Sequence, residues 1–123
     1  MQRTETKDSP YFLLDRNLGL IMLKGRSSLL ETKKFYEPLL EVIKIYVDTK
    51  PEYTKMIVDL DRFNTSSSKY ILEIFNILRI LIKMKLKVEV DWYYDDIDDS
   101  MHEAGGDYSE IVKELPFNLI LKN

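Results

Sequence analysis

The sequence predicts a single α/β domain, in which helices pack on a mixed sheet of four to five strands. Short apolar or alternating runs, typical of strands, are interspersed with longer segments whose apolar residues recur every three to four positions. No linker or repeat divides the chain, and its 123 residues suit one domain. Strands that alternate with helices favour a layered α/β arrangement.

Residues 1–10 are polar and mixed in charge, and we expect a poorly ordered leader before a domain that spans residues 11–123. The domain opens with two apolar runs, residues 11–14 and 18–23, which are separated by residues 15–17, Asp-Arg-Asn. Asp and Asn favour turns because their side chains bond the nearby backbone. The two runs therefore predict a β-hairpin.

Residues 32–47 predict the first helix, because their apolar side chains fall on one stripe and their charged ones on the other. Pro38 removes one helical hydrogen bond, which predicts a bend or a shifted start of the regular helix. Residues 56–60 are apolar and β-branched and predict a central strand buried on both faces. The helix that follows, to about residue 84, has a high apolar share and should be well buried.

Residues 87–92 alternate between apolar and charged side chains, which predicts a strand with Asp91 on its wet face. The run Trp92, Tyr93 and Tyr94 could form a binding hot spot, since aromatic residues dominate interface energies. Alternation predicts that one of the three packs into the core and that only part of the cluster is exposed.

The acidic residues 95–99 lead into a polar segment, which Gly105 and Gly106 are expected to break. A short helix over residues 108–115 and a last strand over residues 117–121 complete the predicted domain.

Composition argues against several classes of function. The net charge of −3 and the pI near 5.2 do not suit a nucleic-acid partner. The chain has no cysteine, which excludes disulfides, zinc–thiolate sites and cysteine nucleophiles. No signal peptide is evident, and no apolar run is long enough to cross a membrane. We therefore expect a cytoplasmic protein with no membrane partner, no cofactor and no resident metal.

The most informative segment is residues 64–69, Asn-Thr-Ser-Ser-Ser-Lys, where four hydroxyl side chains follow a predicted strand and open a predicted helix. One interpretation is structural: Asn64 or a neighbouring hydroxyl caps the helix, and the others satisfy backbone N–H groups that lack helical partners. The other is a phosphorylation site, because the free N–H groups and the helix dipole at such a junction favour a phosphate.

Two other kinds of function remain open. The acidic residues 95–99 could hold a hard cation and, with His102, serve a small metal-dependent hydrolase. The same residues could also be a solvated loop, acids at a helix start, or a surface for a basic partner. A constitutive scaffold that is never phosphorylated is a further alternative.

Several segments of the chain are similar to those of a known family. The sequence resembles the SiaC family of bacterial regulatory phosphoproteins, whose fold is STAS-like, of the anti-sigma-factor-antagonist type. The resemblance covers nearly the whole chain. The segments that carry it are Gly-Arg-Ser-Ser at 25–28, Phe-Tyr-Glu-Pro-Leu at 35–39, Phe-Asn-Thr-Ser-Ser-Ser-Lys at 63–69, Trp-Tyr-Tyr-Asp-Asp at 92–96, Glu-Ala-Gly at 103–105 and Asp-Tyr at 107–108.

The resemblance implies a partner-switching protein that is not itself an enzyme. Thr65 matches the family's phosphoacceptor, with Asn64, Ser66, Ser67 and Lys69 as flanking residues that shape the partner surface. A serine/threonine kinase would phosphorylate Thr65, and a PP2C-like phosphatase would remove the phosphate. The unmodified form is expected to bind an effector, in the family's setting a diguanylate cyclase, and phosphorylation to release it. Such a switch belongs to biofilm and second-messenger control.

The chain departs from the family pattern at residues 29–31. Leu-Leu-Glu stands there in place of Pro-Glu-Asn, just before the first predicted helix. We expect this segment to cap that helix differently. If the segment also touches a partner, the partner would differ as well. The wider STAS class uses an Asp-Ser pair at the acceptor, where this chain has Asn64 and Thr65.

Overall fold

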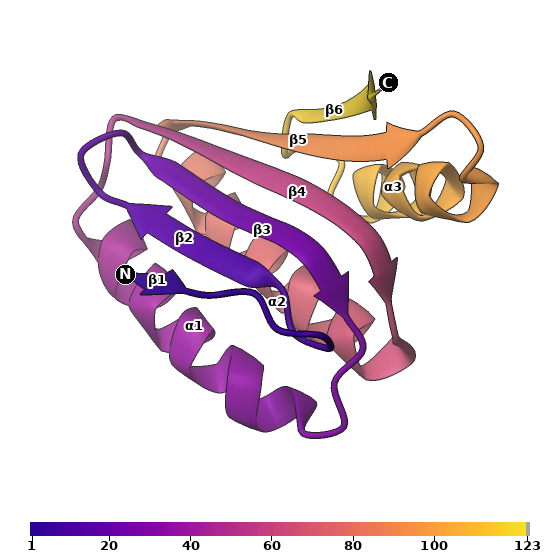
Figure 1. The fold of residues 1–123 in the computed structure, drawn as a ribbon. Coiled ribbons are helices and arrows are strands. Elements are labelled where there is room, and N and C mark those ends of the chain that lie inside the picture. Colours follow the sequence, from indigo (N-terminus) through magenta and orange to yellow (C-terminus); the bar gives the residue numbers. More distant parts are fainter. Residues whose placement is uncertain (123) are drawn as a thin grey trace.

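In the described part of the chain, six strands form one sheet, and their order in space is their order along the chain (Figure 1). The computed structural model describes residues 1–122. The first three strands pair antiparallel, and β3 to β6 pair parallel. The elements are β1 Gln2–Arg3, β2 Tyr11–Asp15, β3 Leu20–Ser27, α1 Thr32–Asp48, β4 Tyr53–Phe63, α2 Thr65–Lys83, β5 Lys87–Asp95, α3 Asp99–Ile111 and β6 Phe117–Lys122.

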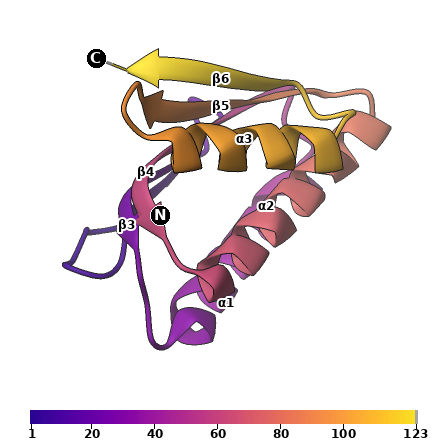
Figure 2. The ribbon, with the colours of Figure 1, turned by 90° about the vertical axis from the view of Figure 1, so that its right-hand side faces the viewer.

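All three helices lie on one side of the sheet, as Figure 2 shows. Each helix connects two neighbouring parallel strands, and successive right-handed crossovers in one direction place their helices on the same face. The α/β class is thus confirmed, although the sheet has one strand more than the four to five predicted. The additional strand lies in the expected leader, where Gln2 and Arg3 pair with Leu13 and Phe12 of β2.

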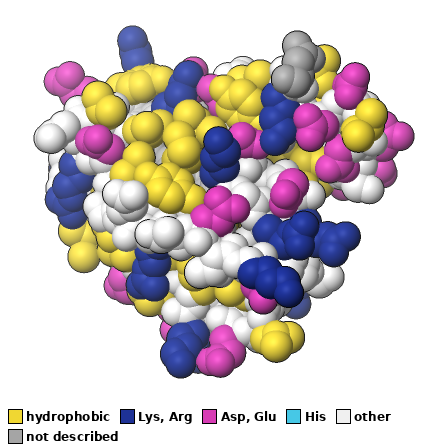
Figure 3. Space-filling view, viewed as in Figure 1, with side chains coloured by type: hydrophobic (Ala, Val, Ile, Leu, Met, Phe, Trp, Pro, Cys, Tyr) yellow, Lys and Arg dark blue, Asp and Glu magenta, His cyan; other side chains and the backbone are white. Residues whose placement is uncertain are grey.

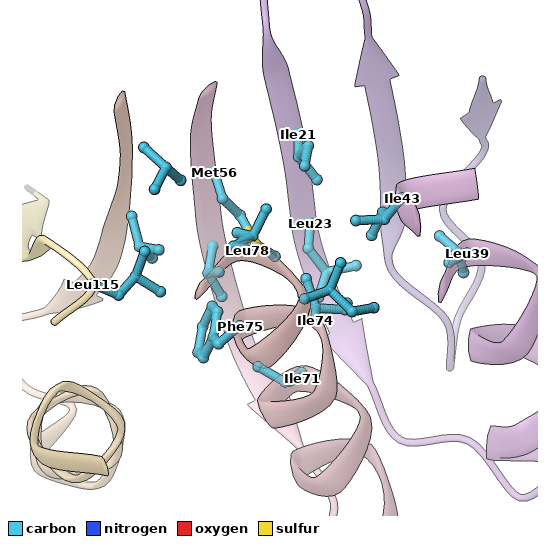
Figure 4. Close-up of a cluster of buried hydrophobic side chains, with 14 of the residues drawn as sticks. Ile21, Leu23, Leu39, Ile43, Met56, Ile71, Ile74, Phe75, Leu78 and Leu115 are labelled. Carbon is cyan, nitrogen blue, oxygen red and sulfur yellow. The ribbon is translucent and has the colours of Figure 1, made fainter. Parts of the chain in front are cut away.

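The core lies between the sheet and the helices. Ile21 and Leu23 of β3 and Met56 of β4 point toward α2 (Figure 4). Fully buried side chains on the facing side of α2 complete the cluster: Ile71, Ile74, Phe75 and Leu78. This helical spacing was visible in the sequence, and it explains why α2 packs centrally while α1 contacts it from the side.

No helix within residues 1–122 covers the other face of the sheet. Hydrophobic side chains gather there over β2 and β3, with charged groups around them (Figure 3). Ile57 of β4 is only partly buried on this face, so the prediction that β4 is buried on both sides was wrong. A short apolar run is compatible both with a strand buried on two faces and with a strand buried on one face. The placement of all helices on one side of the sheet determines which of the two occurs.

Asp91 is buried on this open face, where the sequence predicted a solvated side chain. Its carboxylate lies 3.0 Å from Lys55 Nζ and accepts a hydrogen bond of 2.9 Å from Asn118 Nδ2. Lys55 also lies 3.1 Å from Glu89. Hydrogen bonds to these two carboxylates raise the pKa of Lys55. The burial of Asp91 therefore depends on partners from the two neighbouring strands, which alternation along β5 does not reveal.

Helix α1 continues through Pro38, whose side chain is exposed, instead of starting anew around it. Helix α3 differs more from expectation, because it begins at Asp99 and includes both Gly105 and Gly106. The side chain of Asp98 caps it by accepting a hydrogen bond from the Met101 N–H at 3.0 Å. None of the helices within residues 1–122 is both long and apolar enough to span a bilayer.

Gly105 explains why a helix forms across a predicted break. A Cβ at this position would lie 2.5 Å from Trp92 Cδ1 and 2.7 Å from Leu119 Cδ2, so only glycine permits this approach of α3 to β5 and β6. Trp92 is fully buried and donates from Nε1 to the carbonyl of Met101 at 3.0 Å. These contacts offset the low helix propensity of two glycines. They also confirm that one aromatic residue of the 92–94 cluster packs into the core.

Candidate functional site

The hydroxyl-rich segment forms the junction between β4 and α2, at the carboxyl end of the parallel strands. Asn64 is the N-cap, with extended backbone angles, and its Oδ1 accepts a hydrogen bond from the Ser67 N–H at 3.0 Å. Thr65 is the first residue of the helix. The N–H groups of the first helical positions have no acceptor within the helix. The structural interpretation, a helix capped by Asn64, therefore describes the local geometry.

The four hydroxyl residues differ in exposure. Thr65 and Ser66 are exposed, Ser67 is fully buried and Ser68 is partly buried. Ser68 Oγ donates to the carbonyl of Thr65 at 2.6 Å. Of the four, Thr65 and Ser66 therefore offer accessible hydroxyl groups, whereas Ser67 supports the surface from beneath.

Ser67 belongs to a buried hydroxyl network that also contains Ser27 and Tyr36. Ser27 Oγ donates to Ser67 Oγ at 2.8 Å, and Ser67 Oγ donates to the Ser27 carbonyl at 3.0 Å. The Tyr36 hydroxyl lies 2.6 Å from Ser27 Oγ. Burial raises the pKa of Tyr36 to about 12, and the hydrogen bond with Ser27 opposes part of this rise. The network connects β3, α1 and α2 directly below Thr65 and Ser66.

The segment that departs from the family pattern lies against the same junction. Asn64 Nδ2 donates to the carbonyl of Leu29 at 2.9 Å, and the hydroxyls of Ser66 and Thr32 are 2.6 Å apart. Leu30 is fully exposed beside them. A groove of about 640 Å³ opens here. Its lining residues come from the segment before α1 and from the first turns of α1 and α2: Leu30, Glu31, Thr32, Lys33, Lys34, Glu37, Ser66 and Tyr70.

Charged groups near the junction favour an added negative charge. The first turn of α2 contains no acidic residue. Lys69 is exposed and lies four positions after Thr65, which places both on the same side of the helix. The carboxylates that precede the junction have basic neighbours: Asp59 pairs with Lys122, and Asp61 lies 3.9 Å from Arg26 Nε.

Helix α3 is tied to the same turn. The Tyr108 hydroxyl donates to the carbonyl of Ser68 at 2.8 Å, and its ring packs against Phe75 and Trp92. Burial raises the pKa of Tyr108. Sequence reasoning missed the contributions of Ser27, Tyr36 and Tyr108, because each lies far along the chain from its partner. All three residues lie in segments that carry the resemblance to the family, at 25–28, 35–39 and 107–108, and this is the signal in the sequence that points to them.

The acidic stretch runs from the end of β5 to the start of α3, and His102 lies near the start of that helix. Asp98 caps α3, and Asp99 lies in its first turn. The His102 ring packs on Tyr94 with a centroid separation of 4.5 Å. Within residues 1–122, no three His, Asp or Glu side chains are grouped so that they could hold a metal ion.

Fold and site together define a small α/β domain with accessible hydroxyl groups at a helix start. The chain belongs to the SiaC family of regulatory phosphoproteins, whose profile matches residues 3–122. This confirms the resemblance read from the motifs. No curated protein sequence matches the chain.

Three solved structures from Pseudomonas aeruginosa share the fold at 18% sequence identity. A chain of the diguanylate cyclase SiaD complex with its activator SiaC has a TM-score of 0.93, with 99% of both chains covered. A structure of SiaC has a TM-score of 0.89 over 99% of this chain and 98% of that one. The apo-SiaC crystal structure has a TM-score of 0.90, with 97% and 96% covered.

Proposed function

We propose that this protein is a partner-switching regulator whose state is set by phosphorylation of Thr65. The observation that carries the proposal is the position of Thr65. It is exposed at the first position of a capped helix, above a buried network of hydroxyl groups that holds the helix start in place. Membership of a family of regulatory phosphoproteins supports the same role.

A phosphate on Thr65 would be well accommodated. It would add about −1.5 to −2 charges beside free backbone N–H groups at the positive end of the α2 dipole. Lys69 lies one turn further along the same side, and no acidic residue of the first turn opposes the new charge. Phosphorylation would thus change the surface and leave the fold intact.

The surface that changes consists of Thr65, Ser66, Lys69 and the neighbouring Leu30. In the unmodified state it is polar with an exposed leucine, which suits a partner that buries Leu30. Thr65 is next in the chain to Ser66, which lines a groove together with that leucine. A doubly charged group there would impose a desolvation cost on the partner and weaken the complex. A serine/threonine kinase and a PP2C-like phosphatase would set the balance between the two states.

The effector proposed for the unmodified form is a diguanylate cyclase. The support for this choice is the related fold of SiaC, which forms a complex with the diguanylate cyclase SiaD as its activator. The Leu-Leu-Glu segment at residues 29–31 lies against Asn64 and Ser66, the two neighbours of the acceptor. The effector surface that this chain recognises is therefore expected to present an apolar pocket for Leu30.

The test uses the full chain, a co-encoded serine/threonine kinase and a co-encoded diguanylate cyclase. Intact mass and phosphopeptide mapping should find one phosphate on Thr65, none on Thr65→Ala, and unchanged modification of the matched control Ser66→Ala. Titration should then show that phosphorylation weakens cyclase binding by about tenfold or more, which corresponds to 1.4 kcal/mol.

A phosphate on Ser66 or Ser68 instead, or cyclase binding that full phosphorylation leaves unchanged, would refute the proposal. Thr65→Asp is a weaker probe, because one carboxylate carries less charge than a phosphate. It should nevertheless bind the cyclase less well than the parent.

A further inference from the structure

The strand β6 forms an edge of the sheet, and within residues 1–122 no strand pairs with its outer side. The Val90 N–H donates to the carbonyl of Pro116 at 2.9 Å. From this bond, the alternation of a parallel ladder directs the N–H and C=O groups of Asn118 and Ile120 toward β5. The backbone groups of Leu119 and Leu121 therefore point outward and are open to a further strand.

The edge also exposes apolar side chains. Leu119 is 37% and Leu121 is 48% exposed, and both share the helix side of the sheet with Trp92 and Tyr94. Edge strands are often protected by a lysine. Lys122, the lysine of this strand, instead pairs with Asp59 on the open face of the sheet and leaves the edge uncovered.

Helix α3 lines this edge with negative charge. Asp99, Glu103, Asp107 and Glu110 recur at helical spacing and form an acidic stripe, and α3 has no Lys or Arg. A groove of about 530 Å³ runs between the stripe and Leu119. Gly106 lies in its wall, where a Cβ would meet no atom within 4 Å.

We propose that β6 and the acidic stripe form a docking edge for an extended, basic segment of a partner protein. The segment adds to the sheet as a strand and bonds to the outward backbone groups of Leu119 and Leu121. Its Arg or Lys side chains face α3, so that their aliphatic stems cover the two leucines and their charged ends reach the acidic stripe. This surface is separate from Thr65, and the inference does not depend on phosphorylation.

Charge favours such a partner over a second copy of the chain. If two β6 strands paired antiparallel to continue the sheet, a twofold axis perpendicular to it would place both α3 helices on the same face. The two acidic stripes would then face each other, and like charges at close range oppose association. A basic segment meets the stripe with opposite charge.

The test measures binding of a fluorescent, end-capped octapeptide of alternating arginine and valine by anisotropy. Two control peptides separate charge from strand pairing. Replacing arginine with glutamate reverses the charge, and replacing valine with proline keeps the charge but prevents a regular ladder. We expect both controls to bind at least about tenfold more weakly than the arginine–valine peptide. The glutamate peptide loses the attraction to the acidic stripe, and the proline peptide loses backbone hydrogen bonds to β6.

Variants of the protein locate the site. Leu121→Pro removes an outward N–H group and should weaken binding about tenfold, whereas the matched Leu121→Val keeps that group and should change binding by about twofold at most. Glu103→Lys with Asp107→Lys, and separately Gly106→Leu, which fills the groove, should each weaken binding as strongly as Leu121→Pro. Circular dichroism checks that every variant is folded.

Equal binding of the arginine–proline peptide, or no effect of Leu121→Pro in a folded protein, would reduce the interaction to general charge attraction and refute the proposal. Self-association of the parent chain that Leu121→Pro abolishes would also refute it, since a second copy would then occupy the edge.

Discussion

The side chain of Asn64 donates a hydrogen bond of 2.9 Å to the backbone carbonyl of Leu29, 35 positions earlier in the chain. Through its other atom, Oδ1, the same side chain caps helix α2. One residue thus fixes both the start of the helix that carries Thr65 and the segment that exposes Leu30. The helix cap and the binding surface are therefore coupled through Asn64.

Two substitutions separate these roles of Asn64. Asn64→Ala loses the cap and the bond to Leu29, and should lower the free energy of unfolding by about 1–2 kcal/mol. Asn64→Asp keeps an acceptor for the Ser67 N–H, and its charge suits a helix start, so the loss should be smaller. Urea unfolding gives both values. If Asn64→Asp is as unstable as Asn64→Ala, the bond to the Leu29 carbonyl, which a carboxylate cannot make, outweighs the cap.

The adjacent glycines of α3 should respond oppositely to alanine. Gly106→Ala adds a methyl group in open space and should raise the free energy of unfolding by about 0.5–1 kcal/mol through helix propensity. Gly105→Ala forces a methyl group against Trp92 and should lower it by about 1–3 kcal/mol despite the same propensity gain. Urea unfolding, followed by the fluorescence of the single tryptophan, tests both. Equal effects would contradict the close packing of α3 on β5.

Neighbouring serines in the first turn of α2 should also differ. Ser67→Ala removes a buried hydroxyl and leaves the Ser27 hydroxyl without its acceptor, which should cost about 1–3 kcal/mol of stability. Ser66→Ala, at an exposed position, should cost about 0.5 kcal/mol or less. Thermal and urea unfolding of the two variants provide the comparison. If Ser66→Ala were less stable than Ser67→Ala, the hydrogen bond between Ser66 and Thr32, and not the buried network of Ser67, would stabilise the start of α2.

Burial of Tyr36 should make the protein sensitive to alkali. Its pKa is about 12 in the folded chain and about 10 when unfolded, so its neutral form contributes stability that is complete below pH 10 and is lost as the pH rises to 12. Between pH 8 and pH 11 this residue alone should lower the free energy of unfolding by about 1.4 kcal/mol.

The control for this pH effect is Tyr36→Phe, which lacks the titrating group. Its loss of stability between the same two pH values should be smaller than that of the parent by that amount. Urea midpoints at pH 8 and pH 11 give the difference. Parallel losses in both proteins would show that other tyrosines, such as the buried Tyr108, account for the alkaline instability.

Much of this fold could be predicted from the sequence, because periodic patterns record which face of an element is buried. The apolar stripe of α2 and the alternation that buries Trp92 are examples. Patterns failed where a distant contact decided the local structure. In the sequence, Gly105 predicts a helix break, and only its contact with β5 explains why the helix continues. Asp91 is predicted to be solvated, but Lys55 and Asn118 of the adjacent strands bind its carboxylate.

The candidate site divides in the same way. The sequence marked residues 64–69 as a helix start, and the resemblance to a family marked Thr65 within it. Neither could indicate that Ser67 is buried or that Ser27 and Tyr36 support it, because those residues lie 40 and 31 positions earlier in the chain. The hydroxyl side chains are alike in sequence, and only their three-dimensional surroundings distinguish them.

The agreement between strand order and chain order has a consequence for how the domain assembles. Each strand pairs with the strand before it, so no strand has to be inserted between two that are already joined. Each parallel pair closes one crossover through a single helix, between residues such as Leu20 and Lys55 or Val90 and Phe117, and no pair requires a longer loop. As the chain leaves the ribosome, the sheet can therefore grow in one direction, with each helix covering the strands just added. In a nascent chain halted before residue 117, β6 is not yet present, so β5 forms the edge of the sheet. Its unpaired backbone groups and the side chain of Trp92 would then be exposed and prone to aggregation.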